Sequence, residues 1–195
     1  MMLTLPNILT LSRVAVIPLF VGLFFLETAT GQWIAWGVFT FAAITDFFDG
    51  YLARARGQLS AFGTFLDPVA DKLLVASALL MMVGFGQIDG LAILPAVIIL
   101  CREILVSGLR EYLAGVSVGL PVSKLAKWKT TIQMVAIGIL IVGDAAHPIL
   151  SKTIPVREIG EAGLWAAAII TLITGYDYIR SGLRHMDTPP AAPKQ

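Results

Sequence analysis

The sequence predicts an all-α integral membrane protein built from six transmembrane helices. Of its 195 residues, 57% are hydrophobic and only 14% are charged. The mean hydropathy of +0.83 also lies far outside the range of soluble domains of this length. In addition, six apolar stretches could cross a hydrocarbon core of about 30 Å, which takes about 20 helical residues.

The net charge argues against a nucleic-acid-binding protein, and the cysteine count excludes a fold held by internal disulfides. A formal net charge of +1 gives no overall field for nucleic acid, and the chain has no long basic run. The single cysteine, Cys101, cannot form an internal disulfide, and we expect it to be a small apolar residue of the core.

The predicted spans are residues 14–25, 33–52, 62–85, 91–113, 124–142 and 159–178. The first is short, but it is lengthened by an amphipathic lead-in, residues 3–11, in which Pro6 can begin a helix. We expect this segment to be an N-terminal interfacial helix with its leucines along the membrane surface. A signal peptide is the alternative, which the late Arg13, the missing small-residue cleavage site and the five following spans disfavour.

The basic residues predict the orientation in the membrane. With both termini in the cytoplasm, 12 of the 14 lysines and arginines fall on the cytoplasmic side, and only Lys152 and Arg157 fall outside. We expect one domain over residues 1–186. The proline-rich residues 187–195 are expected to form a disordered cytoplasmic tail.

Four aspartates mark the candidate active site. Asp46 and Asp49 lie near the end of the second span, and Asp67 and Asp71 lie near the start of the third. Spacings of three or four residues place each pair on one face of its helix. Because a short connection joins these antiparallel helices, the two rows should meet. Ionisable residues at membrane depth are usually functional.

Four carboxylates in one poorly hydrated pocket would repel one another, so they need protons or cations. Cations fit better, and an all-oxygen ligand set favours magnesium, manganese or calcium over zinc. Two ions sharing four carboxylates are typical of phosphoryl chemistry. Small residues between the aspartates would leave room for a diphosphate, whose charge Arg54 could contact; these residues are Gly50, Ala53 and Gly63. The alternative is that the aspartates are solvated at helix ends or pair with Arg54 and Arg56.

The string D-x2-D-G-x2-A-R-x8-G-x3-D-x3-D is matched at every position from Asp46 to Asp71. It resembles the signature of CDP-alcohol phosphotransferases. Three further stretches, 6–13, 102–111 and 124–133, extend the resemblance to the bacterial phosphatidylglycerophosphate synthases of that family. One departure is Ser123, where a glycine is expected before the lysine pair, and it leaves open which lysine faces the pocket.

The resemblance implies phosphatidyl transfer from CDP-diacylglycerol to glycerol 3-phosphate, giving phosphatidylglycerol phosphate and CMP. It implies two divalent cations, Mg²⁺ or Mn²⁺, held by Asp46, Asp49, Asp67 and Asp71, with Asp71 as general base. It also implies a homodimer in the bacterial inner membrane, with the active site open to the cytoplasmic leaflet. Asp46 lies about 12 Å along the helix from Arg54, which corresponds to the depth of the lipid phosphates. The acyl chains of the lipid could therefore stay in the bilayer while its diphosphate reaches the ions.

The acceptor phosphate needs cationic partners. Candidates are Arg102, Arg110, Lys127 and Lys129, on the cytoplasmic halves of the fourth and fifth spans. Arg102 could instead form an ion pair with Glu103 or with an aspartate. Lys129 and Arg110 could instead anchor lipid headgroups. Arg13, with Thr10, could line the same opening, although a solvated helix face is the simpler interpretation.

Two alternative functions stay open at this point. Another CDP-alcohol phosphotransferase would use an acceptor such as inositol phosphate or serine. A divalent-cation transporter would also carry intramembrane carboxylates, but the external halves of the helices hold no matching acidic residues.

Overall fold

The computed structural model describes residues 5–56, 61–115, 124–146, 148–150 and 153–186, and in these ranges it is helical without strands. The all-α prediction is therefore confirmed. The described residues form six α-helices and two short 3₁₀ helices in this order: α1 (Leu5–Phe24), α2 (Ala29–Arg56), α3 (Ala61–Gly84), η1 (Gly90–Ala92), α4 (Ile93–Gly115), α5 (Lys124–Val142), η2 (Gly143–Ala146) and α6 (Val156–Met186).

Each predicted span corresponds to one observed helix. From Leu5 onward, the amphipathic lead-in belongs to the same continuous helix as the first span, Leu5–Phe24, as a segment that lengthens the span should. No glycine or proline lies between Asn7 and Ile17, so nothing in the backbone ends the helix where the first span was predicted to begin. The predicted tail, residues 187–195, lies outside the described residues.

Three of the described helical segments are long and apolar enough to cross a membrane: Gly90–Gly115, Trp128–Ala146 and Val156–Gly182. A shorter apolar helix covers Thr10–Phe24. The count of six spans stays a prediction.

Large apolar side chains lie on the outside of α4 and α6. Ile104 is 62% exposed and Tyr176 is 65% exposed. Such faces suit contact with lipid rather than with water. Cys101 is exposed among these residues, so the expectation of a core cysteine is wrong. A helix that faces lipid can carry a small apolar residue outward without the penalty that water would impose.

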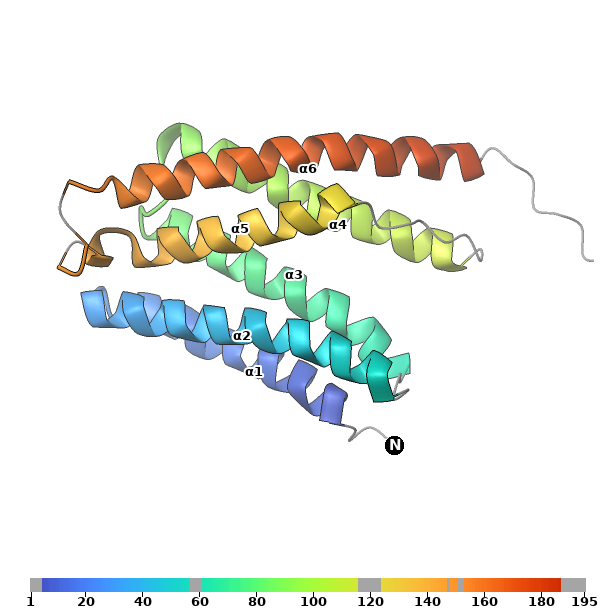
Figure 1. The fold of residues 1–195 in the computed structure, drawn as a ribbon, viewed down its shortest axis with the longest axis horizontal. Helices are drawn as coiled ribbons and strands as arrows, with labels where there is room; N and C mark the ends of the chain where they lie inside the picture. The colour runs from blue at the N-terminus through green and yellow to red at the C-terminus, as the bar shows by residue number, and fades with distance from the viewer. Residues whose placement is uncertain (1–4, 57–60, 116–123, 147, 151–152, 187–195) are drawn as a thin grey trace, which may run out of the picture.

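Consecutive α-helices alternate in direction, so that their ends form two ends of the bundle (Figure 1). Helix α6 packs against both α4 and α5, and α1 packs against both α2 and α3. Small residues allow the close approach of α6 to α5. A Cβ atom added at Gly160 would lie 2.7 Å from Leu140 Cγ, and one at Gly163 would lie 3.0 Å from Ala136 Cβ.

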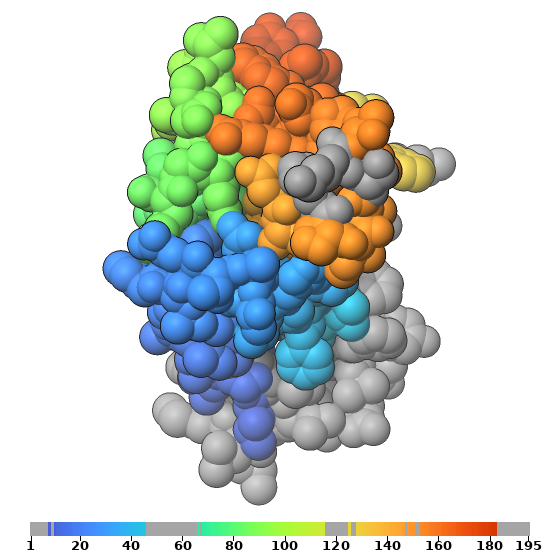
Figure 2. Space-filling model, turned by 90° about the vertical axis from the view of Figure 1, so that its left-hand side faces the viewer, coloured from blue at the N-terminus to red at the C-terminus, as the bar shows by residue number. Residues whose placement is uncertain are grey.

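Figure 2 faces the end that holds the turns from α1 to α2, from α3 to α4 and from α5 to α6. Arg157 of α6 contacts Asp89 Oδ2, which precedes η1, at 2.7 Å. It also contacts Glu161 Oε1, one turn along its own helix, at 3.1 Å. Trp33 Nε1 donates to the carbonyl of Ala145 at 3.2 Å. The opposite end, at the right of Figure 1, gathers the C-terminal end of α2 and the N-terminal end of α3, where the aspartates lie.

Candidate active site

The two aspartate rows lie on two continuous helices. Asp46 and Asp49 belong to the last part of α2, and Asp67 and Asp71 belong to the first part of α3. The prediction of two rows assumed that each pair of aspartates lies on an α-helix, and the backbone is helical at all four positions. The side chains of Asp46, Asp49 and Asp67 lie outside the described part of the structure, as do those of Ala53 and Arg54 and the surroundings of Gly50 and Gly63.

Asp71 is held by a buried arginine from α1. Arg13 Nη1 donates to Asp71 Oδ1 at 2.9 Å. The side chain of Arg13 is 1% exposed and that of Asp71 is 46% exposed. Thr10, one turn before Arg13, is also buried. The interpretation of Thr10 and Arg13 as a solvated helix face is wrong, because α1 turns this face toward the helices it packs against.

Asp71 fits the predicted role of a metal ligand. Its carboxylate is a hard oxygen donor, and nearly half of its side chain is accessible while Arg13 contacts one oxygen. Among the residues whose side chains are described, no three acids, histidines or cysteines cluster to hold an ion. Because three of the four predicted ligands fall outside that set, the four-aspartate site stays a prediction.

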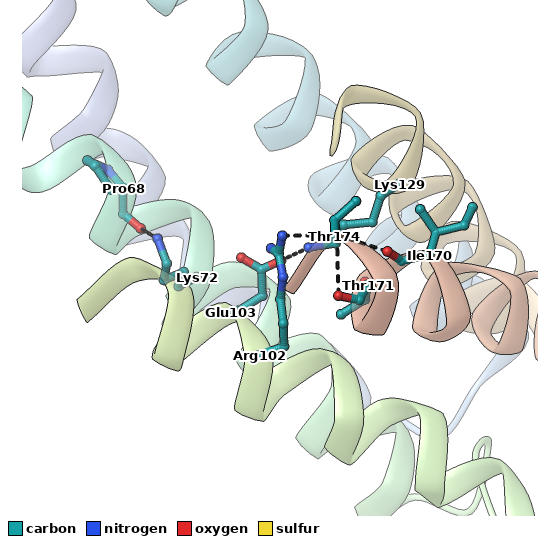
Figure 3. Close-up of polar contacts among 8 residues, drawn as sticks. All are labelled: Pro68, Lys72, Arg102, Glu103, Lys129, Ile170, Thr171 and Thr174. Atoms are coloured by element: carbon teal, nitrogen blue, oxygen red, sulfur yellow. Dashed lines mark hydrogen bonds and ion pairs between the residues drawn. The ribbon is translucent and has the colours of Figure 1, made fainter. Parts of the chain in front are cut away.

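A second polar cluster joins α4, α5 and α6 (Figure 3). Glu103 Oε1 accepts a hydrogen bond from Lys129 Nζ, and Arg102 Nη1 lies 3.4 Å from the same oxygen. Lys129 is 2% exposed, so its suggested role as a lipid-headgroup anchor is wrong. The ion pair between Arg102 and Glu103, considered as an alternative for Arg102, is present. A buried cation and its carboxylate thus link α5 to α4.

Arg102 also contacts α6. Its Nη2 donates to Thr174 Oγ1 at 3.2 Å, and its guanidinium carbon lies 5.7 Å from the centre of the Tyr178 ring. The hydroxyl of Thr174 lies within hydrogen-bond distance of the carbonyls of Ile170 and Thr171. Donation to these carbonyls leaves the oxygen free to accept from Arg102.

Gly175 makes this position of Arg102 possible. A Cβ atom at Gly175 would lie 3.1 Å from Arg102 Cγ, which is closer than side chains normally approach. The arginine stem therefore lies directly against the backbone of α6.

Lys72 of α3 is the basic residue next to the aspartate row in the sequence. It follows Asp71 on α3, and its Nζ donates to the carbonyl of Pro68 at 2.9 Å. Figure 3 shows Lys72 on the same side of the cluster as Glu103.

The structure thus brings together two of the four residues predicted to bind the acceptor phosphate, Arg102 and Lys129. Arg110 lies farther along α4 and is exposed, and the side chain of Lys127 lies outside the described part. Three residues near the cluster were not predicted from the sequence to belong to a site: Lys72, Thr174 and Gly175. Thr174 did carry a signal, as a hydroxyl residue within an apolar stretch of α6.

A cavity of about 450 Å³ opens at the other end of the bundle, beside the turn from α1 to α2. Its lining includes Glu27, Phe85 and Gln87, all remote in sequence from the aspartate rows. It is not the predicted active site. That site is formed largely by side chains outside the described part.

Comparisons with known proteins agree with the signature. A family model described as CDP-alcohol phosphatidyltransferase matches residues 3–173. A Rickettsia typhi protein named CDP-diacylglycerol–glycerol-3-phosphate 3-phosphatidyltransferase is 45% identical over 92% of this chain and 97% of its own length. Proteins of the same name from Cereibacter sphaeroides and Pectobacterium atrosepticum are 39% and 40% identical, over 94% and 95% of this chain and 97% of each relative. The chain therefore belongs to the CDP-alcohol phosphatidyltransferase family.

Proposed function

We propose that this enzyme transfers a phosphatidyl group from CDP-diacylglycerol to glycerol 3-phosphate, giving phosphatidylglycerol phosphate and CMP. The observation that carries the proposal is the similarity, over nearly the full length of both chains, to transferases whose names state this donor and acceptor. The complete aspartate signature supports the same reaction class.

In the proposed reaction, the acceptor hydroxyl oxygen forms a bond to the phosphorus that carries diacylglycerol. The bond from that phosphorus to the bridging oxygen breaks, and CMP leaves. Asp71 accepts the proton of the hydroxyl. Its half-exposed carboxylate can reach a substrate, while Arg13 holds one oxygen at 2.9 Å.

Asp46, Asp49, Asp67 and Asp71 would hold two divalent cations, Mg²⁺ or Mn²⁺. Such ions stabilise charge on the entering and leaving oxygens. Gly50, Ala53 and Gly63 would let the CDP-lipid diphosphate lie against α2 and α3, with Arg54 contacting its charge.

The cluster around Glu103 supports the acceptor assignment. Arg102 and Lys129 carry two positive charges against the one carboxylate of Glu103, so one positive charge remains unbalanced. A phosphate monoester carries nearly two negative charges at neutral pH, about −1.5 to −2. Charge-assisted hydrogen bonds from Arg102 and Lys129 would bind it, and Arg110 and Lys127 would attract it from the surface.

For the whole molecule we propose a single domain over residues 1–186 with six spans and both termini in the cytoplasm. It would form a homodimer in the bacterial inner membrane. The alternation of helix direction supports the arrangement of the spans, and the distribution of lysine and arginine supports the orientation.

The test is an assay of purified protein with labelled CDP-diacylglycerol, magnesium and separate acceptors. Glycerol 3-phosphate should give phosphatidylglycerol phosphate and CMP. Glycerol should hardly react, because it has no phosphate dianion to accept charge-assisted hydrogen bonds from Arg102 and Lys129. If serine or inositol phosphate outcompetes glycerol 3-phosphate, the acceptor assignment is wrong although the transferase assignment stands.

A further inference from the structure

Glu103 contacts Arg102 and Lys129, the two enclosed cations of the polar cluster between α4, α5 and α6, through one oxygen, Oε1. We call these three residues the acceptor cluster. Its side chain is 21% exposed, whereas those of Arg102 and Lys129 are 12% and 2% exposed. The carboxylate is therefore the most accessible member of the three. An anion that approaches these cations meets groups that already have a negative partner.

We propose that Glu103 is an internal competitor of the acceptor phosphate for Arg102 and Lys129. It neutralises the two cations while the site is empty, gives way when the phosphate binds, and returns when the phosphorylated product leaves. This inference rests on the proposed function, since the phosphate is that of glycerol 3-phosphate.

The geometry favours exchange at Arg102 over exchange at Lys129. The 3.4 Å contact between Arg102 and Glu103 is long for a charge-assisted hydrogen bond, which is normally about 2.7–2.9 Å. Arg102 is held independently by Thr174 and by the ring of Tyr178. Arg102 can therefore turn a guanidinium edge to a phosphate first, without losing its place on α6, and Lys129 exchanges its partner afterwards.

The energetic consequence concerns the empty site. An enclosed lysine without a negative partner is strongly unfavourable, so Glu103 stabilises the empty site more than the phosphate-bound one. By linkage, a ligand is bound more weakly when the state without it is stabilised. Glu103 should therefore weaken anion binding and speed release of the phosphorylated product.

Glu103→Gln removes the charge and keeps the shape of the side chain. We expect sulfate, used as a phosphate-like dianion, to bind this variant about tenfold more tightly or better than it binds the unaltered enzyme, because the cations lose their internal partner. The KM for glycerol 3-phosphate should fall in the same direction. The kcat should also fall, because product leaves more slowly. A purely structural role for Glu103 would instead weaken anion binding.

Three further proteins make the test specific. Glu103→Asp keeps the charge and should bind sulfate nearly as the unaltered enzyme does. The double variant Glu103→Gln with Lys129→Met removes one negative and one positive charge and should return sulfate affinity toward the original value. Glu111→Gln removes an exposed acid from the same helix and should change nothing.

Sulfate affinity is measured by calorimetry on the detergent-solubilised enzyme without turnover, and thermal unfolding of each variant with and without sulfate checks the fold. If Glu103→Gln melts too early for calorimetry, its stabilisation by sulfate must exceed that of the unaltered enzyme. Equal or weaker sulfate binding by Glu103→Gln overturns the inference. Failure of the unaltered enzyme to use glycerol 3-phosphate overturns the proposed function instead, so the two failures are distinguishable.

Discussion

Arg13 of α1 and Asp71 of α3 form an ion pair of 2.9 Å in which the arginine is almost fully enclosed and the carboxylate is half exposed. This asymmetry fits a carboxylate that must reach a substrate on its exposed side while the enclosed Arg13 fixes its orientation. Arg13 has no place in the aspartate signature, yet it contacts that signature's last residue.

Replacing Arg13 with alanine should lower kcat at least tenfold, because Asp71 loses the group that orients it. Arg13→Lys should recover part of the loss, since an ammonium supplies charge without the fork of donors. The matched control is Arg157→Ala, which breaks an arginine–carboxylate pair at the opposite end of the bundle. Unchanged kcat in Arg13→Ala, measured with saturating CDP-diacylglycerol and glycerol 3-phosphate, would contradict the positioning role.

Replacing Asp46, Asp49 or Asp67 with asparagine should abolish turnover, because each change removes one charge from the proposed ligand set. Magnesium removal by chelation should do the same, and added magnesium or manganese should restore activity. Zinc should restore little, given the all-oxygen ligands. Near-normal activity of all three variants at saturating magnesium would refute the metal site.

Asp71→Asn tests the proposed base separately from metal binding. A positioned base contributes about 10² or more to the rate, so the chemical step should slow by at least that factor. Single-turnover rates must be compared with magnesium and CDP-lipid affinities measured on the same protein. Retained binding with lost turnover supports the base, whereas loss of both leaves only the ligand role.

Arg102→Ala should raise the KM for glycerol 3-phosphate more than Arg110→Ala does. Arg102 is enclosed between α4 and α6 and contacts Thr174, whereas Arg110 is exposed to solvent and screened by it. The affinity for CDP-diacylglycerol should stay nearly constant in both variants. Equal effects on KM would show that the enclosed position of Arg102 has no importance for the acceptor.

Gly175→Ala should displace Arg102 without changing any charge. The added methyl group would lie 3.1 Å from Arg102 Cγ, so the arginine stem must move away from α6. We expect a KM for glycerol 3-phosphate several times higher, with CDP-diacylglycerol affinity unchanged. Gly108→Ala is the control, because a Cβ atom there meets no heavy atom within 4 Å. If the two variants behave alike, Arg102 does not depend on Gly175.

Helix positions and the aspartate rows could be predicted because both depend on local pattern. Apolar runs of sufficient length marked each helix, and spacings of three and four residues placed Asp46 with Asp49 and Asp67 with Asp71. The amphipathic lead-in was expected to lengthen the first span, and α1 is continuous from Leu5 to Phe24 because no residue interrupts the two segments.

Partnerships between distant helices could not be predicted from local pattern. Arg13 and Asp71 are 58 positions apart, and Arg102 and Thr174 are 72 positions apart. Burial of Lys129 follows from the way α5 packs between its neighbours, which periodicity does not reveal. Cys101 was misjudged because the usual burial habit of cysteine reverses on a face that meets lipid.

The contacts of Arg102 with Thr174 and Tyr178 also bear on how the enzyme is made. Both partners lie in α6, so a ribosome must deliver all five preceding α-helices before the cluster around Arg102 can close. The helices with the aspartate rows emerge much earlier. If the proposed sites are right, a nascent chain that ends before α6 would hold the donor-binding residues without a finished acceptor cluster, and activity would begin only with the arrival of α6.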